Sequence, residues 1–135
     1  MRHLTDHIVS GDQAVQLDIM VTDEPGAGGA NHRYEVSGFD ATDNPSNYDR
    51  ELDTSGPKQL TVIFQNGPIK EHGVNGVTQE ALLAVVIDRL RSFQAGPFSC
   101  RENAIALTHV EEALMWLQRR TVARIKRGVE GTNQE

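Results

Sequence analysis

Residues 93–103 read FQAGPFSCREN, and this stretch is expected to reverse the chain between two helices. Before it, apolar residues recur at helical spacing from Leu82 to Phe93, and Thr78 is a typical N-cap residue. Gly96 and Pro97 end this helix, because glycine suits a helix C-terminus and proline cannot continue one. After the stretch, a second apolar stripe has a spacing near 3.5 and contains Leu107, Val110, Leu114, Leu117 and Thr121. The pattern predicts an antiparallel helical hairpin, with helices over residues 78–95 and from about 99 to about 126.

The start of the second expected helix has two interpretations. Ser99 and Glu102 fit a capping box, in which the serine hydroxyl accepts from one free backbone N–H and the glutamate reaches back to another. Arg101 is unusual in a first helical turn, because the helix dipole is positive there and disfavours a cation. Either Arg101 meets an anion held by the free N–H groups, or it points to solvent or to a carboxylate of another subunit. Phe98 is likewise either a core or interface residue or a ring that stacks on a base.

The first half of the chain shows the two-residue alternation of strands. Expected strands cover residues 14–21, 33–39 and 58–64, and a return strand over 69–74 follows the hairpin turn Asn66-Gly67. Residues 41–57 read as a long loop. The fold class is therefore α+β, an N-terminal antiparallel β meander followed by a C-terminal antiparallel helical hairpin. One domain is expected over residues 1–135, made of a β region (1–77), the hairpin (78–127) and a tail (128–135).

Composition narrows the classes of partner. The chain has 135 residues and a net charge of −6, and residues 1–57 hold 11 acidic but only three basic side chains. Such an acidic surface argues against a groove for DNA or RNA, although a local cluster of N–H groups and arginines could still hold a small anion. No apolar run is long enough to span a bilayer, so no membrane partner is expected. A single cysteine and the lack of a signal-peptide pattern predict a reducing, cytoplasmic compartment.

Catalytic and metal-binding patterns are weak. The five histidines are scattered, and zinc needs three or four converging ligands. Cys100 has no adjacent base to activate it as a nucleophile. The glycines of residues 26–29 follow a strand but open no helix, which is not the arrangement of a phosphate-binding loop. We therefore expect no catalytic residue, no metal and no cofactor.

The second helix is expected to pack on two sides. Residues 114–117, Leu-Met-Trp-Leu, are apolar around too wide an arc for one buried stripe, which indicates an oligomer interface that includes Trp116. On the first helix, Arg89 and Arg91 leave the apolar stripe on different sides, so at most one of them should face any single pocket. Arginine suits a phosphate better than lysine does, because its planar fork can donate two hydrogen bonds at once.

Several strings resemble a known family. They are FQNGPIKE (64–71), GVNGV (73–77), IDRL (87–90), FQAGPFSCRENA (93–104) and EEALMWL (111–117). They resemble the first Thoeris anti-defence family of phage proteins, and the helical half resembles the hairpin domain shared with phage anti-CBASS sponges. The resemblance is close over roughly residues 60–131, whereas the first fifty residues match only as an acidic β region.

The resemblance implies a function that composition alone does not. Proteins of this kind are not enzymes. They bind and sequester cyclic ADP-ribose variants, and also cyclic dinucleotides or trinucleotides at separate sites, in the infected host cytoplasm. Several assemble as dimers and as hexamers built from three dimers.

The resemblance also implies roles for individual residues. Phe64 would stack on adenine, and Asn75 with Asn66 would hydrogen-bond ribose or base. Arg89 or Arg91 would meet the pyrophosphate. A cyclic oligonucleotide near subunit junctions would be bound by Arg101 and the joint residues Gly96, Pro97, Phe98 and Ser99. The competing hypotheses are a DNA-binding regulator and a structural or regulatory oligomer without a nucleotide ligand.

Overall fold

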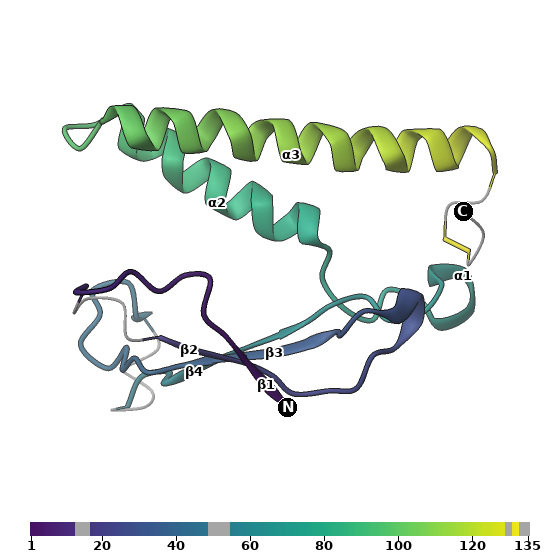
Figure 1. Ribbon diagram of the computed structural model, residues 1–135, viewed down its shortest axis with the longest axis horizontal. Helices are drawn as coiled ribbons and strands as arrows, with labels where there is room; N and C mark the ends of the chain where they lie inside the picture. The colour runs from purple at the N-terminus through teal and green to yellow at the C-terminus, as the bar shows by residue number, and fades with distance from the viewer. Residues whose placement is uncertain (13–16, 49–54, 129–130, 133–135) are drawn as a thin grey trace. The chain divides into compact units, whose positions relative to one another are not determined.

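The computed structural model describes residues 1–12, 17–48, 55–128 and 131–132. An antiparallel sheet forms the N-terminal part and helices form the C-terminal part (Figure 1), which confirms the expected α+β class. The chain divides into two compact units, Met1–Ile63 and Phe64–Glu135. The first unit contains the sheet, and the second contains the helical hairpin together with all ten predicted ligand-binding residues.

The sheet of the first unit is a four-stranded meander. Its strands are β1 (Arg2–Leu4), β2 (Asp18–Val21), β3 (Arg33–Ser37) and β4 (Gln59–Ile63), in the order β1-β2-β3-β4. Every neighbouring pair is antiparallel, and the register places His3 opposite Met20, Met20 opposite Glu35, and Glu35 opposite Thr61. Strand β1 lies in a segment where no strand was expected. Residues 13–16, the start of one expected strand, lie outside the described residues.

Both ends of the long loop between β3 and β4 are tied together. The Ala41 N–H donates to the Pro57 carbonyl over 2.9 Å, and the Gly56 N–H donates to Thr42 Oγ1 over 2.9 Å. The Thr42 hydroxyl donates in turn to Asp40 Oδ1 over 2.5 Å, and its backbone N–H donates to the same oxygen over 3.0 Å. These two hydrogen bonds favour the carboxylate and hold the pKa of Asp40 below its ordinary value. A Cβ at Gly56 would lie 2.3 Å from the Thr42 nitrogen, so this close approach requires glycine.

The prediction of a return strand after Asn66-Gly67 is wrong. A short helix, α1 (Ile69–His72), stands there instead, with Pro68 as its N-cap. A type I′ hairpin turn needs positive φ at both central residues, and here only Gly67 has it, at +90°. Pro68 also lacks the N–H that a return strand would have to donate. The chain instead forms an isolated parallel bridge between Phe64 and Val77, in which the Gln65 N–H donates to the Val77 carbonyl over 2.9 Å.

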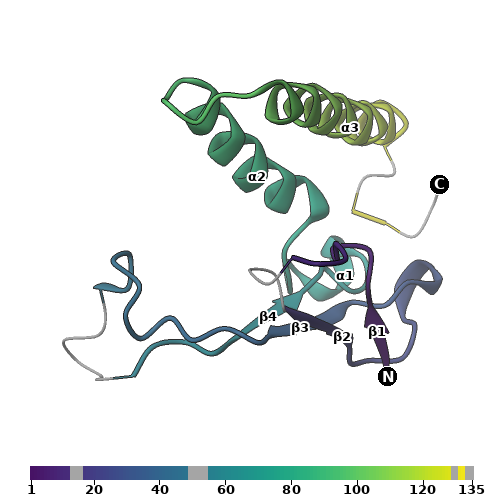
Figure 2. The same cartoon turned by 60° about the vertical axis from the view of Figure 1, so that its left-hand side comes forward.

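The helical hairpin is present as expected. Helix α2 (Gln79–Gln94) begins after Thr78, whose hydroxyl accepts from the Ala81 N–H over 3.1 Å, so the predicted N-cap is confirmed. Helix α3 (Arg101–Lys126) packs along α2 (Figure 2). It ends before Gly128, whose φ of +71° suits a helix C-terminus. Ile87 is the buried apolar residue of α2, whereas many other apolar side chains of the hairpin remain exposed.

The predicted capping box at Ser99 is wrong by one residue. The N-cap of α3 is Cys100, and its Sγ accepts from the Asn103 N–H over 3.4 Å. Because the helix starts at Arg101, Glu102 occupies the second helical position rather than the third, where a capping-box glutamate stands. The Cys100 N–H donates to Gln94 Oε1 over 3.1 Å, so the last residue of α2 takes the role that Glu102 was expected to have.

Candidate functional site

An interlocked pair of side-chain amides, from Gln65 and Asn75, closes the loop that carries α1. Gln65 Nε2 donates to the carbonyls of Gly73 (2.8 Å) and Gly67 (3.1 Å), and Gln65 Oε1 accepts from the Asn75 N–H over 2.9 Å. Asn75 Oδ1 accepts from the Asn66 N–H over 2.9 Å, and Asn75 Nδ2 donates to the Asn66 carbonyl over 2.7 Å. We call Gln65, Asn66 and Asn75 the amide clamp. Gln65 was not singled out in the sequence, because nothing in its neighbourhood indicates a partner ten residues away.

The clamp brings three predicted ligand-binding residues together. Phe64 is half-buried next to Gln65, while Asn66 and Asn75 are exposed. The Asn75 amide uses one N–H and one lone pair on the backbone of Asn66, which leaves a second N–H and a second lone pair. Asn75 can therefore hold the loop and hydrogen-bond a ligand at the same time.

We expect Asn75→Ala to destabilise the fold as well as any complex. It removes two hydrogen bonds in an exposed setting, so the free energy of unfolding should fall by roughly 1–2 kcal/mol. The thermal midpoint should fall by several degrees. Asn66→Ala is the comparison, because both clamp bonds go to the Asn66 backbone and survive that change. Equal thermal midpoints for the Asn75→Ala variant and the unsubstituted protein would show that the clamp does not stabilise the loop.

The two candidate arginines of α2 have different partners. The Arg91 guanidinium forms an ion pair with Glu111 of α3 over 2.7 Å, and both side chains are more than a third exposed. The Arg89 guanidinium lies over the Phe93 ring, 5.0 Å from its centroid. Such an arrangement is a cation–π contact, which fixes the side chain without using its N–H groups. Being two residues apart on a helix, the arginines face different sides, as expected.

The joint between the two helices is exposed. Phe98 is 73% exposed, so it is not a core residue of its own chain. Pro97, Ser99 and Arg101 are also exposed, and Gly96 is half-buried. Arg101 is the first residue of α3, where the dipole disfavours a cation. These exposed side chains fit either an interface with another subunit or a bound anion.

The predicted residues do not form one compact site. Helix α2 has 16 residues, so its two ends lie roughly 24 Å apart at 1.5 Å per residue. Phe64 and Asn75 precede its first turn, and the joint follows its last turn. The structure thus groups the residues into the clamp with Phe64, the arginines on α2, and the joint. A single small ligand cannot touch the clamp and the joint of the same chain.

No group of three or more His, Cys, Asp or Glu side chains in the described ranges could hold a metal ion. In that same part of the chain, no helix combines the length and apolar character needed to cross a membrane.

The comparisons with known proteins identify the hairpin. Residues 57–122 match the family described as Acb2/Tad1, hairpin domain. This segment, a little under half of the chain, is therefore similar to an Acb2/Tad1 hairpin domain. The sequence is also similar to Thoeris anti-defense 1 of Bacillus phage SBSphiJ7, with 59% identity over 78 residues. That segment covers 58% of this chain and 55% of the relative, so the chain spans little more than half of the relative's length. The family resemblance inferred from the sequence is confirmed.

Proposed function

We propose that the protein is a phage anti-defence sponge. It binds cyclic nucleotide immune signals in the cytoplasm of the infected host and withholds them without degrading them. Its ligands are cyclic ADP-ribose variants, together with cyclic dinucleotides or trinucleotides. One observation carries the proposal: the hairpin-domain match over residues 57–122 includes all ten predicted ligand-binding residues. The name of the relative from Bacillus phage SBSphiJ7, a Thoeris anti-defense protein, supports the same class.

The clamp supplies the base and ribose contacts in this proposal. A ring beside hydrogen-bonding amides suits a nucleotide, because the base stacks on the ring while its polar edge meets the amides. Stacking of a base on an aromatic side chain contributes about 1–3 kcal/mol. Phe64 is the stacking residue, and Asn75, held in place by the Asn66 backbone, offers one N–H and one lone pair to ribose or base.

Arg89 is the better candidate for the pyrophosphate. Its contact with the Phe93 ring orients the guanidinium and leaves its N–H donors available. Arg91 would have to exchange or share its ion pair with Glu111. Such an exchange has a low cost, since exposed ion pairs contribute only about 0–1 kcal/mol. We therefore expect Arg89 to contribute more than Arg91 to binding of the pyrophosphate.

Assembly of several copies would complete the sites. The clamp lies before α2 and Arg89 lies in its eleventh position, roughly 15 Å along the helix from its start. Two copies of the chain that place the clamp of one beside Arg89 of the other would bring both groups to the same ligand. The exposed joint, with Phe98 and Arg101, would serve a cyclic oligonucleotide at another junction between copies. A homodimer, or a hexamer of three dimers, provides such junctions.

The alternative is an oligomeric phage protein with a structural or regulatory role and no nucleotide ligand. Exposed apolar side chains on the hairpin favour this candidate as much as they favour an assembled sponge. They include Val85, Val86, Ile105, Met115, Trp116, Val122 and Ile125. An interface explains these residues, and it would explain Arg101 as well where another copy places a carboxylate beside the start of α3.

A release experiment tests sequestration against degradation. The protein is incubated with a cyclic ADP-ribose variant, freed of unbound nucleotide by gel filtration, and then denatured by heat. We expect the released nucleotide to be intact by mass and chromatography, because the proposed contacts include no nucleophile or general base. Recovery of a hydrolysed nucleotide would show an enzyme, and recovery of no nucleotide would favour the alternative.

A further inference from the structure

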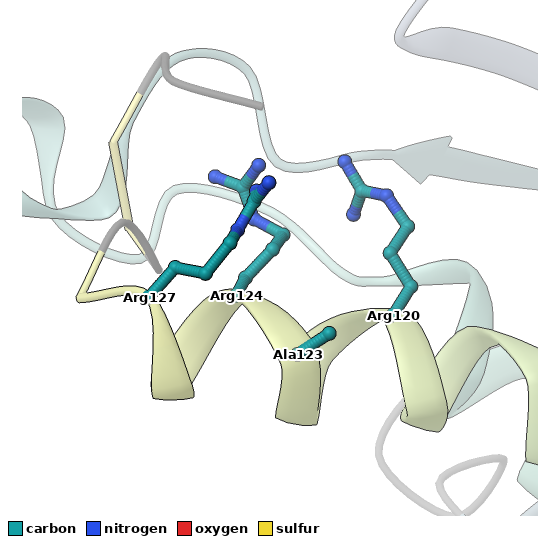
Figure 3. Close-up of a pocket in the computed structure, with 4 residues that line it drawn as sticks. All are labelled: Arg120, Ala123, Arg124 and Arg127. Carbon is teal, nitrogen blue, oxygen red and sulfur yellow. The ribbon is translucent and has the colours of Figure 1, made fainter.

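One hollow on the surface of α3 is lined by three arginines. Arg120, Ala123, Arg124 and Arg127 line an open hollow of about 400 Å³ near the C-terminal end of the helix. Figure 3 shows the three arginine side chains extending from the same side of α3, with the short Ala123 side chain between them. None of the four belongs to the ligand-binding residues predicted from the sequence. Along α3 the hollow lies roughly 28 Å from Arg101, so it is separate from the joint.

The helix dipole explains only part of this cluster. Cations stabilise the last turn of a helix, and this accounts for Arg124 and for the C-cap residue Arg127. Arg120 lies more than a turn further back, where the dipole effect has faded. Spacings of three and four residues place these cations side by side on one helix face, and such pairs repel each other. A bound anion would relieve this repulsion.

The three side chains differ in how they are held. Arg124 is only 8% exposed, and its Nη2 donates to the Thr132 carbonyl over 3.0 Å, which fixes its guanidinium. Arg120 and Arg127 are exposed, and within the described ranges neither side chain makes a hydrogen bond or an ion pair. The hollow thus combines one anchored cation with two whose donors are available to a ligand.

We propose that this hollow binds the pyrophosphate group of a small phosphorylated anion, with no requirement for a nucleoside. Two phosphates offer oxygens to more than one guanidinium at a time, and each guanidinium can donate two parallel hydrogen bonds to one phosphate. The volume suits a small ligand. The partial negative charge of the helix end opposes an anion, and the full positive charges of Arg120 and Arg127 outweigh it. The site is independent of the clamp and of the joint.

Calorimetric titration with inorganic pyrophosphate at about 0.15 M salt tests the site. The net charge of −6 disfavours non-specific attraction of an anion to the protein as a whole. We expect saturable binding by the full chain and a loss of affinity of at least about tenfold in Arg120→Gln/Arg127→Gln. Both side chains are exposed, so the variant should fold, and its thermal midpoint verifies this. Lys126→Gln, an exposed cation of the same turn that does not line the hollow, should bind as tightly as the unsubstituted protein.

Four results would overturn the proposal. They are the absence of saturable binding by the unsubstituted protein, unchanged affinity in the double variant, equal weakening by Lys126→Gln, and binding of ADP without binding of pyrophosphate. Arg101→Ala should retain pyrophosphate binding, because it lies at the other end of α3. A protein that does not bind pyrophosphate could still bind cyclic nucleotides, because the contacts proposed for those ligands involve other residues. The titration and the release experiment therefore test the two proposals separately.

Discussion

Replacing Trp116 with Glu is expected to convert an assembled protein into monomers. Trp116 is 60% exposed, and Met115 beside it is exposed as well. Tryptophan is frequent among the residues that dominate the binding free energy of an interface, and its removal there costs roughly 2 kcal/mol or more of that energy. In a symmetric dimer the change acts twice, so the dimer dissociation constant should rise by about 1,000-fold. Light scattering coupled to gel filtration measures the change as a fall in mass.

The matched control for this change is Gln118→Glu. Gln118 is an exposed residue of the same helix, two positions away, and the substitution adds the same negative charge. It should leave the assembled mass unchanged, because it removes no apolar surface. An unsubstituted protein that is monomeric at micromolar concentration would contradict the predicted oligomer. An unchanged mass for Trp116→Glu would place the interface elsewhere.

The second large effect is expected at the joint. Arg101→Ala should weaken binding of cyclic oligonucleotides by about 10- to 100-fold, because a hydrogen bond to a charged group contributes roughly 1.5–3 kcal/mol. The thermal midpoint should change by only a few degrees, since the Arg101 side chain is exposed and stands where the dipole disfavours it. Titration of the unsubstituted protein and the variant with cyclic di- and trinucleotides measures the change in affinity.

Lys126→Ala controls for the loss of one positive charge. Lys126 is exposed at the far end of α3, roughly 37 Å from Arg101 along the helix. It should bind cyclic oligonucleotides as the unsubstituted protein does. Identical titration curves for Arg101→Ala and the unsubstituted protein, with every cyclic nucleotide that binds, would remove the joint from the site.

The helical hairpin was predictable because its signals are local. The apolar period of α2, the Thr78 cap and the Gly96-Pro97 break each depend on neighbouring residues only. Reliance on local signals also explains why Ser99 was wrongly predicted as the N-cap. A thiol is a poor cap compared with a hydroxyl, so sequence favoured Ser99, whereas the structure uses Cys100 with help from Gln94. Strand β1 was missed because three residues are too short to show a period.

The region around α1 was predicted wrongly because a distant contact decides it. Asn66-Gly67 is a strong hairpin signal, but Pro68 removes a donor and the amide clamp fixes the loop from Asn75. The contacts of Asn75 with Asn66 and Gln65 join residues nine and ten positions apart, and no periodic pattern in the sequence indicates them. Arg120, Arg124 and Arg127 are four and three residues apart in the sequence, but cations near the end of a helix are also what the helix dipole favours. Only the hollow around Ala123 shows that these side chains share a space.

Native mass spectrometry with added cyclic nucleotides tests the central proposal most directly, because it reports assembly, ligand mass and stoichiometry together. The unsubstituted protein should appear as a dimer or hexamer that carries intact cyclic ADP-ribose variants, with cyclic oligonucleotides bound in addition rather than in competition. An assembly that binds none of these nucleotides would contradict the sponge. So would bound or released species whose mass corresponds to a hydrolysed ring.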